Sequence, residues 1–273
     1  MDAIRDILRS FVPVGGETLS VVRAETQPFA AVDPRRLRIE VGSGGSAQVV
    51  VLHDAPDRSQ LSVVLAAGAR IELVEFFAAG AFAEVSVRQA ADSRCRFTTV
   101  QLAGADAACT VDLDGRGAES VFHGVFLASG KEHCSLALRT NHNVADCRSD
   151  ALVKGVAGGE AVGEFRGLVY VAPDAQRTDA QQQSRNILLG ERARIVTRPQ
   201  LEIYADDVKC AHGATVGQMD AEAILYMRQR GLSEAQARSL QIEGFVGDAV
   251  GRCGIDALRE GLMAAVGEKL QKL

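Results

Sequence analysis

Tryptophan is absent from the 273-residue sequence, and aromatic residues make up only 5% of it. A hydrophobic core must therefore be built from aliphatic side chains, and the hydrophobic content of 47% is ample for one. Enzymes that cleave carbohydrates combine clustered carboxylates with a groove that receives sugar rings, often lined by aromatic side chains. With three tyrosines and no tryptophan, the chain has little material for such a groove.

Several motifs of nucleotide-binding proteins and enzymes are also absent. The sequence contains no G-x-x-x-x-G-K-[ST], no G-x-G-x-x-G after a strand, no G-x-S-x-G and no H-E-x-x-H. The chain therefore shows no nucleotide site of its own. We expect a protein that is not an enzyme.

Charge and hydropathy limit the location and the partners. No apolar run approaches the ~18 residues that a membrane-spanning helix needs, and the first ten residues carry scattered charges instead of the apolar segment of a secretory signal. The net charge is -5, and none of the six cysteines forms a C-x-x-C pair. We expect a cytoplasmic protein with reduced thiols that binds neither nucleic acid nor a membrane.

The middle of the chain is rich in strand-like segments. Runs of Val, Leu, Ile and Phe with period-two alternation recur from Leu37–Val41 to Gln200–Tyr204. Gly, Asp, Ala and Ser turns separate them at a spacing of about 10 to 13 residues, which is typical of an all-β domain. Before this region we expect a short helix from Asp2 to Phe11 and an irregular lead-in with one strand at Leu19 to Arg23.

A sandwich, a barrel and a β-helix all fit this spacing. Three features favour the β-helix: there are more than a dozen strands, the inward positions are small and aliphatic, and equivalent turns keep being added. We therefore predict a mainly β protein with a short lead-in at 1–36, a parallel β-helix (solenoid) at 37–218 and a small helical segment at 219–273.

The C-terminal segment carries clear helix signals. Asp220 is the expected N-cap of a helix from Ala221 to Arg230, with Gly231 just after its end. Ser233-Glu234-Ala235-Gln236 has the pattern of a capping box, so a second helix should begin there. A third is expected from Asp256 to near Leu270. Helices of this length need a packing partner, either the β domain or another chain.

Cys210 and His212 are the most ligand-like pair in the sequence. Residues two apart in an extended segment point to the same face, and a thiolate with an imidazole suits zinc or iron. The alternative is a buried cysteine beside a hydrogen-bonded histidine at a domain junction. Asp206-Asp207 is expected to form a turn, and the polar run Gln181-Gln182-Gln183 a solvated edge. The other histidines, as well as Cys95, Cys109, Cys134 and Cys147, are expected to be structural.

The stretch from about Asn186 to Phe245 resembles the C-terminal core of the SufB/SufD family, which belongs to the Suf iron–sulfur cluster assembly machinery. The resemblance rests on NILLGERARIVTRPQ and on LEIYADDVKCAHGATVGQMDAEAILYMRQRG, which follow each other directly. It implies a right-handed parallel β-helix followed by a helical domain. Leu189-Gly190-Glu191-Arg192 is followed by Ala193, where the SufB type carries a cysteine, so the resemblance favours the SufD type.

The resemblance also implies partners and sites. The family works in a complex with a SufB-type paralogue and an ABC-type ATPase, SufC, and the C-terminal helical segment docks the ATPase. The residues expected at that contact are Asp220, Tyr226, Met227, Arg230 and Phe245. In the K-C-x-H-G motif, Cys210 and His212 match the residues that meet the nascent cluster at the interface between the paralogues.

The resemblance implies no stably bound cofactor, only a transient iron–sulfur cluster within the complex, and a homodimer is an alternative assembly. Typical members are longer and have an N-terminal helical region, which is expected to be missing here or supplied by another chain. Three hypotheses are carried forward: a scaffold subunit in cluster assembly, a carbohydrate-active β-helix enzyme, and a purely architectural oligomeric partner.

Overall fold

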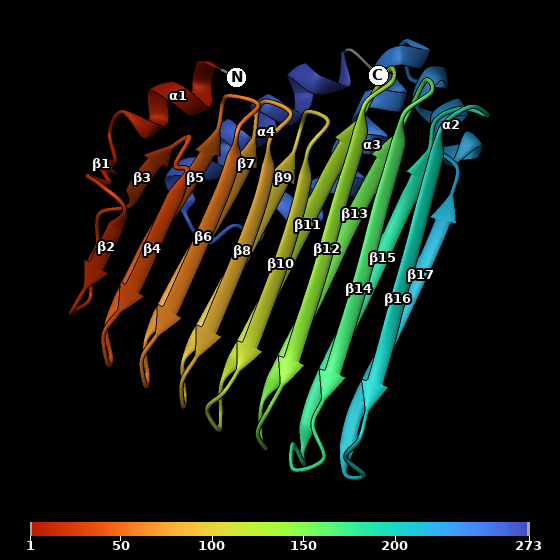
Figure 1. Cartoon of the computed structure of the whole chain (residues 1–273). Helices are drawn as coiled ribbons and strands as arrows, with labels where there is room; N and C mark the ends of the chain where they lie inside the picture. The colour runs from red at the N-terminus through yellow and green to blue at the C-terminus, as the bar shows by residue number, and fades with distance from the viewer. Residues whose placement is uncertain (1, 272–273) are drawn as a thin grey trace.

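The structure is a computed structural model that describes residues 2–271. It contains a long β region, and the helices lie along the upper ends of the strands in the view of Figure 1. The strands are β1 Val12–Pro13, β2 Thr18–Val21, β3 Phe29–Val32, β4 Arg36–Val41, β5 Ser46–His53, β6 Arg58–Leu65, β7 Arg70–Phe77, β8 Phe82–Gln89, β9 Arg94–Gln101, β10 Asp106–Leu113, β11 Glu119–Ala128, β12 His133–His142, β13 Arg148–Ala157, β14 Val162–Val171, β15 Thr178–Leu188, β16 Arg194–Ile203 and β17 Val208–Gly217. The helices are α1 Asp2–Leu8, α2 Ala221–Gln229, α3 Glu234–Val250 and α4 Asp256–Leu270.

The strands form two parallel sheets. One contains the nine odd-numbered strands in sequence order, and the other contains the eight even-numbered strands. Each strand pairs with the second strand along the chain, as Ser46 with Arg70 and Arg70 with Arg94. The chain therefore passes from one sheet to the other and back in every turn. This arrangement confirms the parallel solenoid and excludes an antiparallel sandwich.

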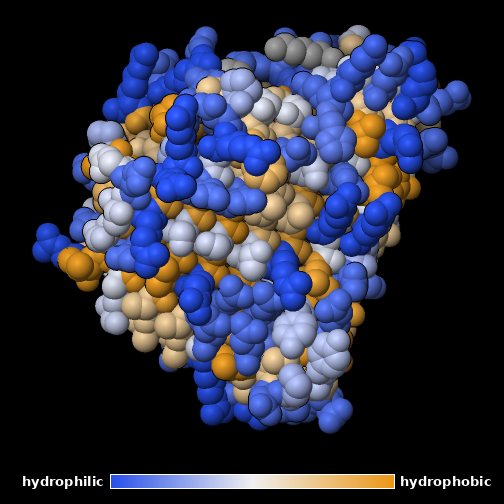
Figure 2. Space-filling model, in the orientation of Figure 1, coloured by the Kyte–Doolittle hydropathy of each residue, from blue (hydrophilic) through white to orange (hydrophobic). Residues whose placement is uncertain are grey.

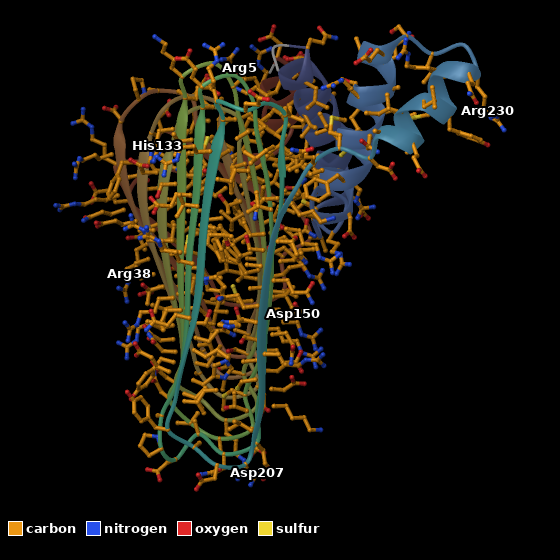
Figure 3. The ribbon with its side chains drawn as sticks, turned by 90° about the vertical axis from the view of Figure 1, so that its right-hand side faces the viewer. Arg5, Arg38, His133, Asp150, Asp207 and Arg230 are labelled. Carbon is orange, nitrogen blue, oxygen red and sulfur yellow. The ribbon has the colours of Figure 1, made fainter. Side chains whose placement is uncertain are left out.

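The solenoid winds in the right-handed sense. In Figure 1 the chain runs down the even strands in front, returns along the odd strands behind, and advances from left to right. Figure 3 shows the two sheets side by side, with the space between them filled by side chains. Because alternate residues of each strand point inward, the interior collects aliphatic residues such as Val49, Val63, Val87 and Leu73, all nearly inaccessible.

Two expectations for local structure were wrong. The lead-in contains three short strands, not one, because β3 pairs with β5 and β2 with β4 as the first turns of the solenoid. The polar run Gln181-Gln182-Gln183 was expected to be a solvated edge. It lies within β15, and the side chain of Gln182 has no exposed surface. Tertiary pairing outweighs the low strand propensity of these residues.

The helix signals of the C-terminal segment are confirmed. The Asp220 carboxylate accepts hydrogen bonds from the backbone N–H groups of Glu222 and Ala223. Ser233 and Gln236 form the reciprocal bonds of a capping box. Gly231, just after α2, has a φ of +97°, a conformation that favours glycine. These side chains fix where α2 and α3 begin.

Helices α1, α3 and α4 cover the outer face of the odd-numbered sheet. Apolar residues of the sheet, including Val74, Phe76 and Val125, form one buried cluster with Ile242 and Leu262 of the helices. Figure 3 shows this helical layer against the upper half of one sheet only. The packing partner that the helices need is therefore the β domain.

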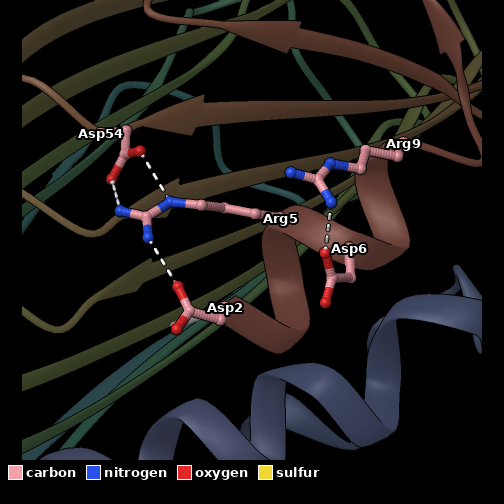
Figure 4. A network of polar contacts seen from close by, with 5 residues as sticks. All are labelled: Asp2, Arg5, Asp6, Arg9 and Asp54. Atoms are coloured by element: carbon pink, nitrogen blue, oxygen red, sulfur yellow. Dashed lines mark hydrogen bonds and ion pairs between the residues drawn. The ribbon is translucent and has the colours of Figure 1, made fainter.

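The N-terminal helix α1 is fastened to the solenoid by ion pairs. Nε and Nη2 of Arg5 donate to the two carboxylate oxygens of Asp54 at 2.9 and 2.7 Å, and Nη1 donates to Asp2 at 2.8 Å (Figure 4). Arg9 pairs with Asp6 within the helix. The bidentate pair adds directional contacts to the packing of Ile4 and Leu8, which are buried in the cluster shared with α4 and the sheet.

The outer face of the even-numbered sheet carries no helix from the described part of the chain. Figure 2 looks onto this face and shows apolar side chains among many charged ones. Within residues 2–271, no helix is long and apolar enough to cross a membrane.

Candidate functional site

Cys210 and His212 lie on β17, the last strand of the odd-numbered sheet. In the register with β15, Cys210 lies beside Ala180 and His212 beside Gln182. Ala180 and Gln182 are fully buried between the two sheets. Because neighbours in a parallel register share a face, Cys210 and His212 also point to the interior side of the solenoid.

The two side chains are accessible because the solenoid ends at this turn. Cys210 is half-buried and packs beside Ala180, Leu201 and Val208, whereas His212 is exposed. A hollow of about 330 Å³ runs along residues 181–185 and 211–215. A ligand or another protein can therefore reach His212 from this hollow, and Cys210 keeps part of its surface exposed beside it.

The surroundings keep the Cys210 thiol protonated. Burial is the main cause that raises its pKa above the usual value, and the charge of Asp179 adds to it, while a backbone hydrogen bond at Ala180 acts in the opposite direction. A metal ion that bound here would displace the proton, because the thiolate is the ligating form.

The pair supplies only two donors. Among residues 2–271, no group of three or more His, Cys, Asp or Glu side chains is arranged to hold a metal ion. A four-coordinate zinc or iron centre would need two further ligands from sulfide, water or another chain. The pair alone therefore does not make a complete metal site among the described residues.

The residues expected at the ATPase contact lie apart from this pair, on α2 and α3. Tyr226 has 54% of its surface exposed, and the Arg230 guanidinium lies 3.8 Å from the centre of its ring. Figure 3 shows Arg230 at the projecting tip of α2. Leu225 and Leu240 are also largely exposed, two apolar residues that the sequence analysis did not single out. The helical tip thus presents apolar and cationic groups together.

Other members of the expected contact are engaged within the chain. Asp220 caps α2, and Met227 is half-buried. Phe245 lies where α3 meets the sheet: its carbonyl accepts a hydrogen bond from Lys154, whose Nζ also lies 4.8 Å from the centre of the Phe245 ring. Of the five residues, Tyr226 and Arg230 are the most available to another protein.

The remaining thiols and histidines are largely structural. Cys95, Cys109, Cys134 and Cys147 are buried, as expected. His53 Nε2 is paired with Glu75 Oε1 at 2.8 Å inside the solenoid, and His142 Nε2 with the Ser149 hydroxyl at the same distance. Asp206 and Asp207 lie in the bend between β16 and β17.

A hollow of about 660 Å³ lies on the outer face of the even-numbered sheet. Its lining includes Glu17, Arg38, Gln60 and Glu84 but no aromatic residue. The carbohydrate hypothesis expects an aromatic-lined groove, and this hollow gives it no support.

Comparisons with known proteins match the chain to a single family. A family model described as "SUF system FeS cluster assembly, SufBD core domain" matches residues 23–245. The chain is 35% identical over 161 residues to the iron–sulfur cluster assembly protein SufD of Escherichia coli, and 30% identical over 250 residues to a SufBD family protein of Mycobacterium leprae. These matches cover 59% and 86% of the chain but only 38% and 64% of the relatives. A SufBD family protein of Synechocystis is 39% identical over 134 residues, which are 49% of this chain and 29% of that relative.

Proposed function

Because the chain belongs to the SufBD core family of the SUF iron–sulfur cluster assembly system, we propose that it is a non-catalytic scaffold subunit in the formation of these clusters. Its own contribution is the pair Cys210 and His212, which meets the nascent cluster as cargo. A SufB-type paralogue supplies the remaining ligands, and an ABC-type ATPase of the SufC type docks on the helical tip.

One observation supports this function best: a thiol and an imidazole lie two residues apart on the terminal strand, facing the open end of the solenoid. Sulfur and nitrogen donors of this kind suit iron and iron–sulfur species. Two donors hold such a cargo only together with a second chain. This favours transient assembly at an interface over a stably bound cofactor.

The proposal is tested by His212→Ala in a complex reconstituted with the two partners. Because the side chain is exposed, the free energy of unfolding should change by no more than about 0.5 kcal/mol. The partners should still bind, and the iron and sulfide content of the complex should fall sharply. Cys210→Ala should reduce the content less, because another thiolate can replace it more easily, and it should cost about 1 kcal/mol of stability because the thiol is half-buried.

Lys209→Ala is the matched control, since Lys209 is an exposed neighbour on the opposite face of β17. It should assemble clusters at the normal rate. Normal assembly by His212→Ala would contradict the proposal, and so would a loss of assembly that only follows a loss of folding. The second result would favour the structural role of His212.

A further inference from the structure

Residues at matching register positions of successive odd-numbered strands lie above one another inside the solenoid, and we call such a set a column. The column that ends at His212 changes from apolar to polar residues. The residues at equivalent positions of the earlier odd-numbered strands are Val49, Leu73, Phe97, Phe122 and Ala151. All of them are apolar and buried. The last two positions of the same column are Gln182 and His212. A column that is apolar through five turns thus becomes polar in its final two.

The carboxamide of Gln182 is buried without a hydrogen-bond partner. The residue has no exposed surface, and neither Nε2 nor Oε1 has a partner among the described residues. Buried polar groups are normally hydrogen-bonded, and both atoms of this carboxamide are free to bond to a group placed beside them. The side chain of His212, the next residue in the column, forms no hydrogen bond with a described residue either.

The opposite sheet leaves room for this carboxamide. Gly167 of β14 faces Gln182 across the interior, and a Cβ atom there would lie 2.4 Å from Oε1 and 2.5 Å from Nε2. The equivalent positions of the preceding even strands are Val85, Cys109 and Leu138. Glycine replaces a larger side chain at the one level where the carboxamide needs space.

We propose that Gln182 positions His212 for binding of the cargo: its Oε1 accepts a hydrogen bond from one ring nitrogen while the other ring nitrogen binds the metal. Strands in a sheet lie about 4.8 Å apart, so the two side chains are within reach of each other. Histidines that bind metals usually donate the second ring N–H to an oxygen acceptor, which fixes the tautomer and orientation of the ring. The inference rests on the proposed function, because it assumes that His212 binds a metal.

The test uses Zn²⁺ as the probe and the full chain with ¹⁵N-labelled histidine. The His212 signals are assigned by their loss in His212→Ala. In the wild-type chain, Zn²⁺ should fix one tautomer of His212 and give a protected imidazole N–H resonance. Gln182→Met, which has a similar size but no acceptor, should lose that resonance and bind Zn²⁺ about tenfold more weakly. Gln182→Glu restores an acceptor and should retain both.

Gln183→Met is the matched control, because Gln183 is the exposed neighbour on the opposite face of β15. It should behave as the wild type, and thermal unfolding confirms the fold of each variant. Unchanged affinity and an unchanged N–H resonance in Gln182→Met would overturn this inference alone. The metal-binding role of His212 would be overturned by a different result. In that case Zn²⁺ would not affect the His212 signals of the wild-type chain, and His212→Ala would bind Zn²⁺ with unchanged affinity. The inference about Gln182 would then fail as well.

Discussion

His142 lies inside the solenoid with no exposed surface. Its Nε2 is paired with the Ser149 hydroxyl, and its Nδ1 has no partner among the described residues. Desolvation lowers its pKa to about 4, with the nearby charge of Asp179 acting in the opposite direction. The folded protein therefore holds this ring neutral, and the unfolded chain takes up a proton first as the pH falls.

This gives a pH dependence with a defined sign. The pKa in the folded state is below the usual 6.5, so the stability is fully present above that value and falls as the pH decreases toward 4. Between pH 7 and 5 the contribution of His142 to this loss should be about 2 kcal/mol. Chemical unfolding at both pH values should show a smaller loss for His142→Asn. The control His133→Asn, at an exposed position, should show the same pH dependence of stability as the wild type. Equal losses of stability in all three proteins would contradict the role of His142 in this pH dependence.

At the level of single residues, the sequence could predict a position only where a local pattern determines it. Alternation along β17 placed Cys210 and His212 on one face, and hydrogen-bonding side chains marked the caps at Asp220 and Ser233. Gln182 was missed because a glutamine in a polar run is usually solvated. Its burial depends on the pairing of β15 with strands on both sides and on the space at Gly167, which are not local properties.

At the level of elements, Lys154 joins α3 to the sheet. Its side chain is 6% exposed, and Nζ donates to the Phe245 carbonyl at 2.7 Å and to Asp248 at 2.9 Å. The bond from Lys154 is the main cause that lowers the pKa of Asp248. Because two acceptors depend on one ammonium group, this contact fixes where α3 lies on β13.

Lys154→Met should keep the aliphatic stem and remove the donor. The Phe245 carbonyl would lose its partner, so the free energy of unfolding should fall by about 1–3 kcal/mol, as measured by denaturant titration. Asp248→Asn keeps an acceptor for Lys154 and should cost clearly less. Equal stability of Lys154→Met and the wild type would show that the helix is held by apolar packing alone.

The tip formed by α2 gives the test of ATPase docking. Tyr226→Asp introduces a charge at a residue that is 54% exposed, so the fold should persist. If Tyr226 lies in a desolvated contact with the SufC-type subunit, binding should weaken by about 2 kcal/mol or more, measured by titration calorimetry. Glu222→Ala, on the same helix, serves as the control. Normal binding by a folded Tyr226→Asp variant would remove this residue from the proposed contact.

At the level of the whole molecule, the solenoid leaves its last turn uncovered. Strands β16 and β17 are the final members of their sheets, and their outer edges pair with no further strand from residues 2–271. Ile203, Tyr204 and Val216 are 38%, 61% and 43% exposed near this end. Unpaired edges with apolar residues favour the addition of another chain. This end is therefore the expected contact with a paralogue or with a second copy.

Val216→Lys tests this contact. In the absence of a SufB-type partner, the wild-type chain should self-associate at micromolar concentration, as measured by analytical ultracentrifugation. A lysine at the edge opposes pairing through its charge, so the variant should sediment as a monomer with an unchanged melting temperature. Val22→Lys, at an exposed position near the other end of the solenoid, is the control. A strictly monomeric wild type would contradict self-pairing.

The solenoid as a whole could be predicted from the sequence, because regular strand spacing and small aliphatic inward residues are repeated many times. The first turns of the solenoid could not be predicted, because β1, β2 and β3 have at most four residues each. Such short strands form only when the next turn is already in place to pair with them. The packing of α3 and α4 on the odd-numbered sheet was likewise undetermined, because their apolar faces were equally compatible with another protein.

The contact between α1 and α4 joins the first and the last helix of the described chain. Gly261 of α4 allows a close approach, since a Cβ atom there would lie 2.5 Å from Cδ1 of Ile7 and 3.1 Å from Cδ1 of Ile4. A mechanical load applied to the two ends would therefore act first on this small helical contact. The helices would peel away before the long parallel ladders carried any tension, so the solenoid is shielded from forces that pull on its termini.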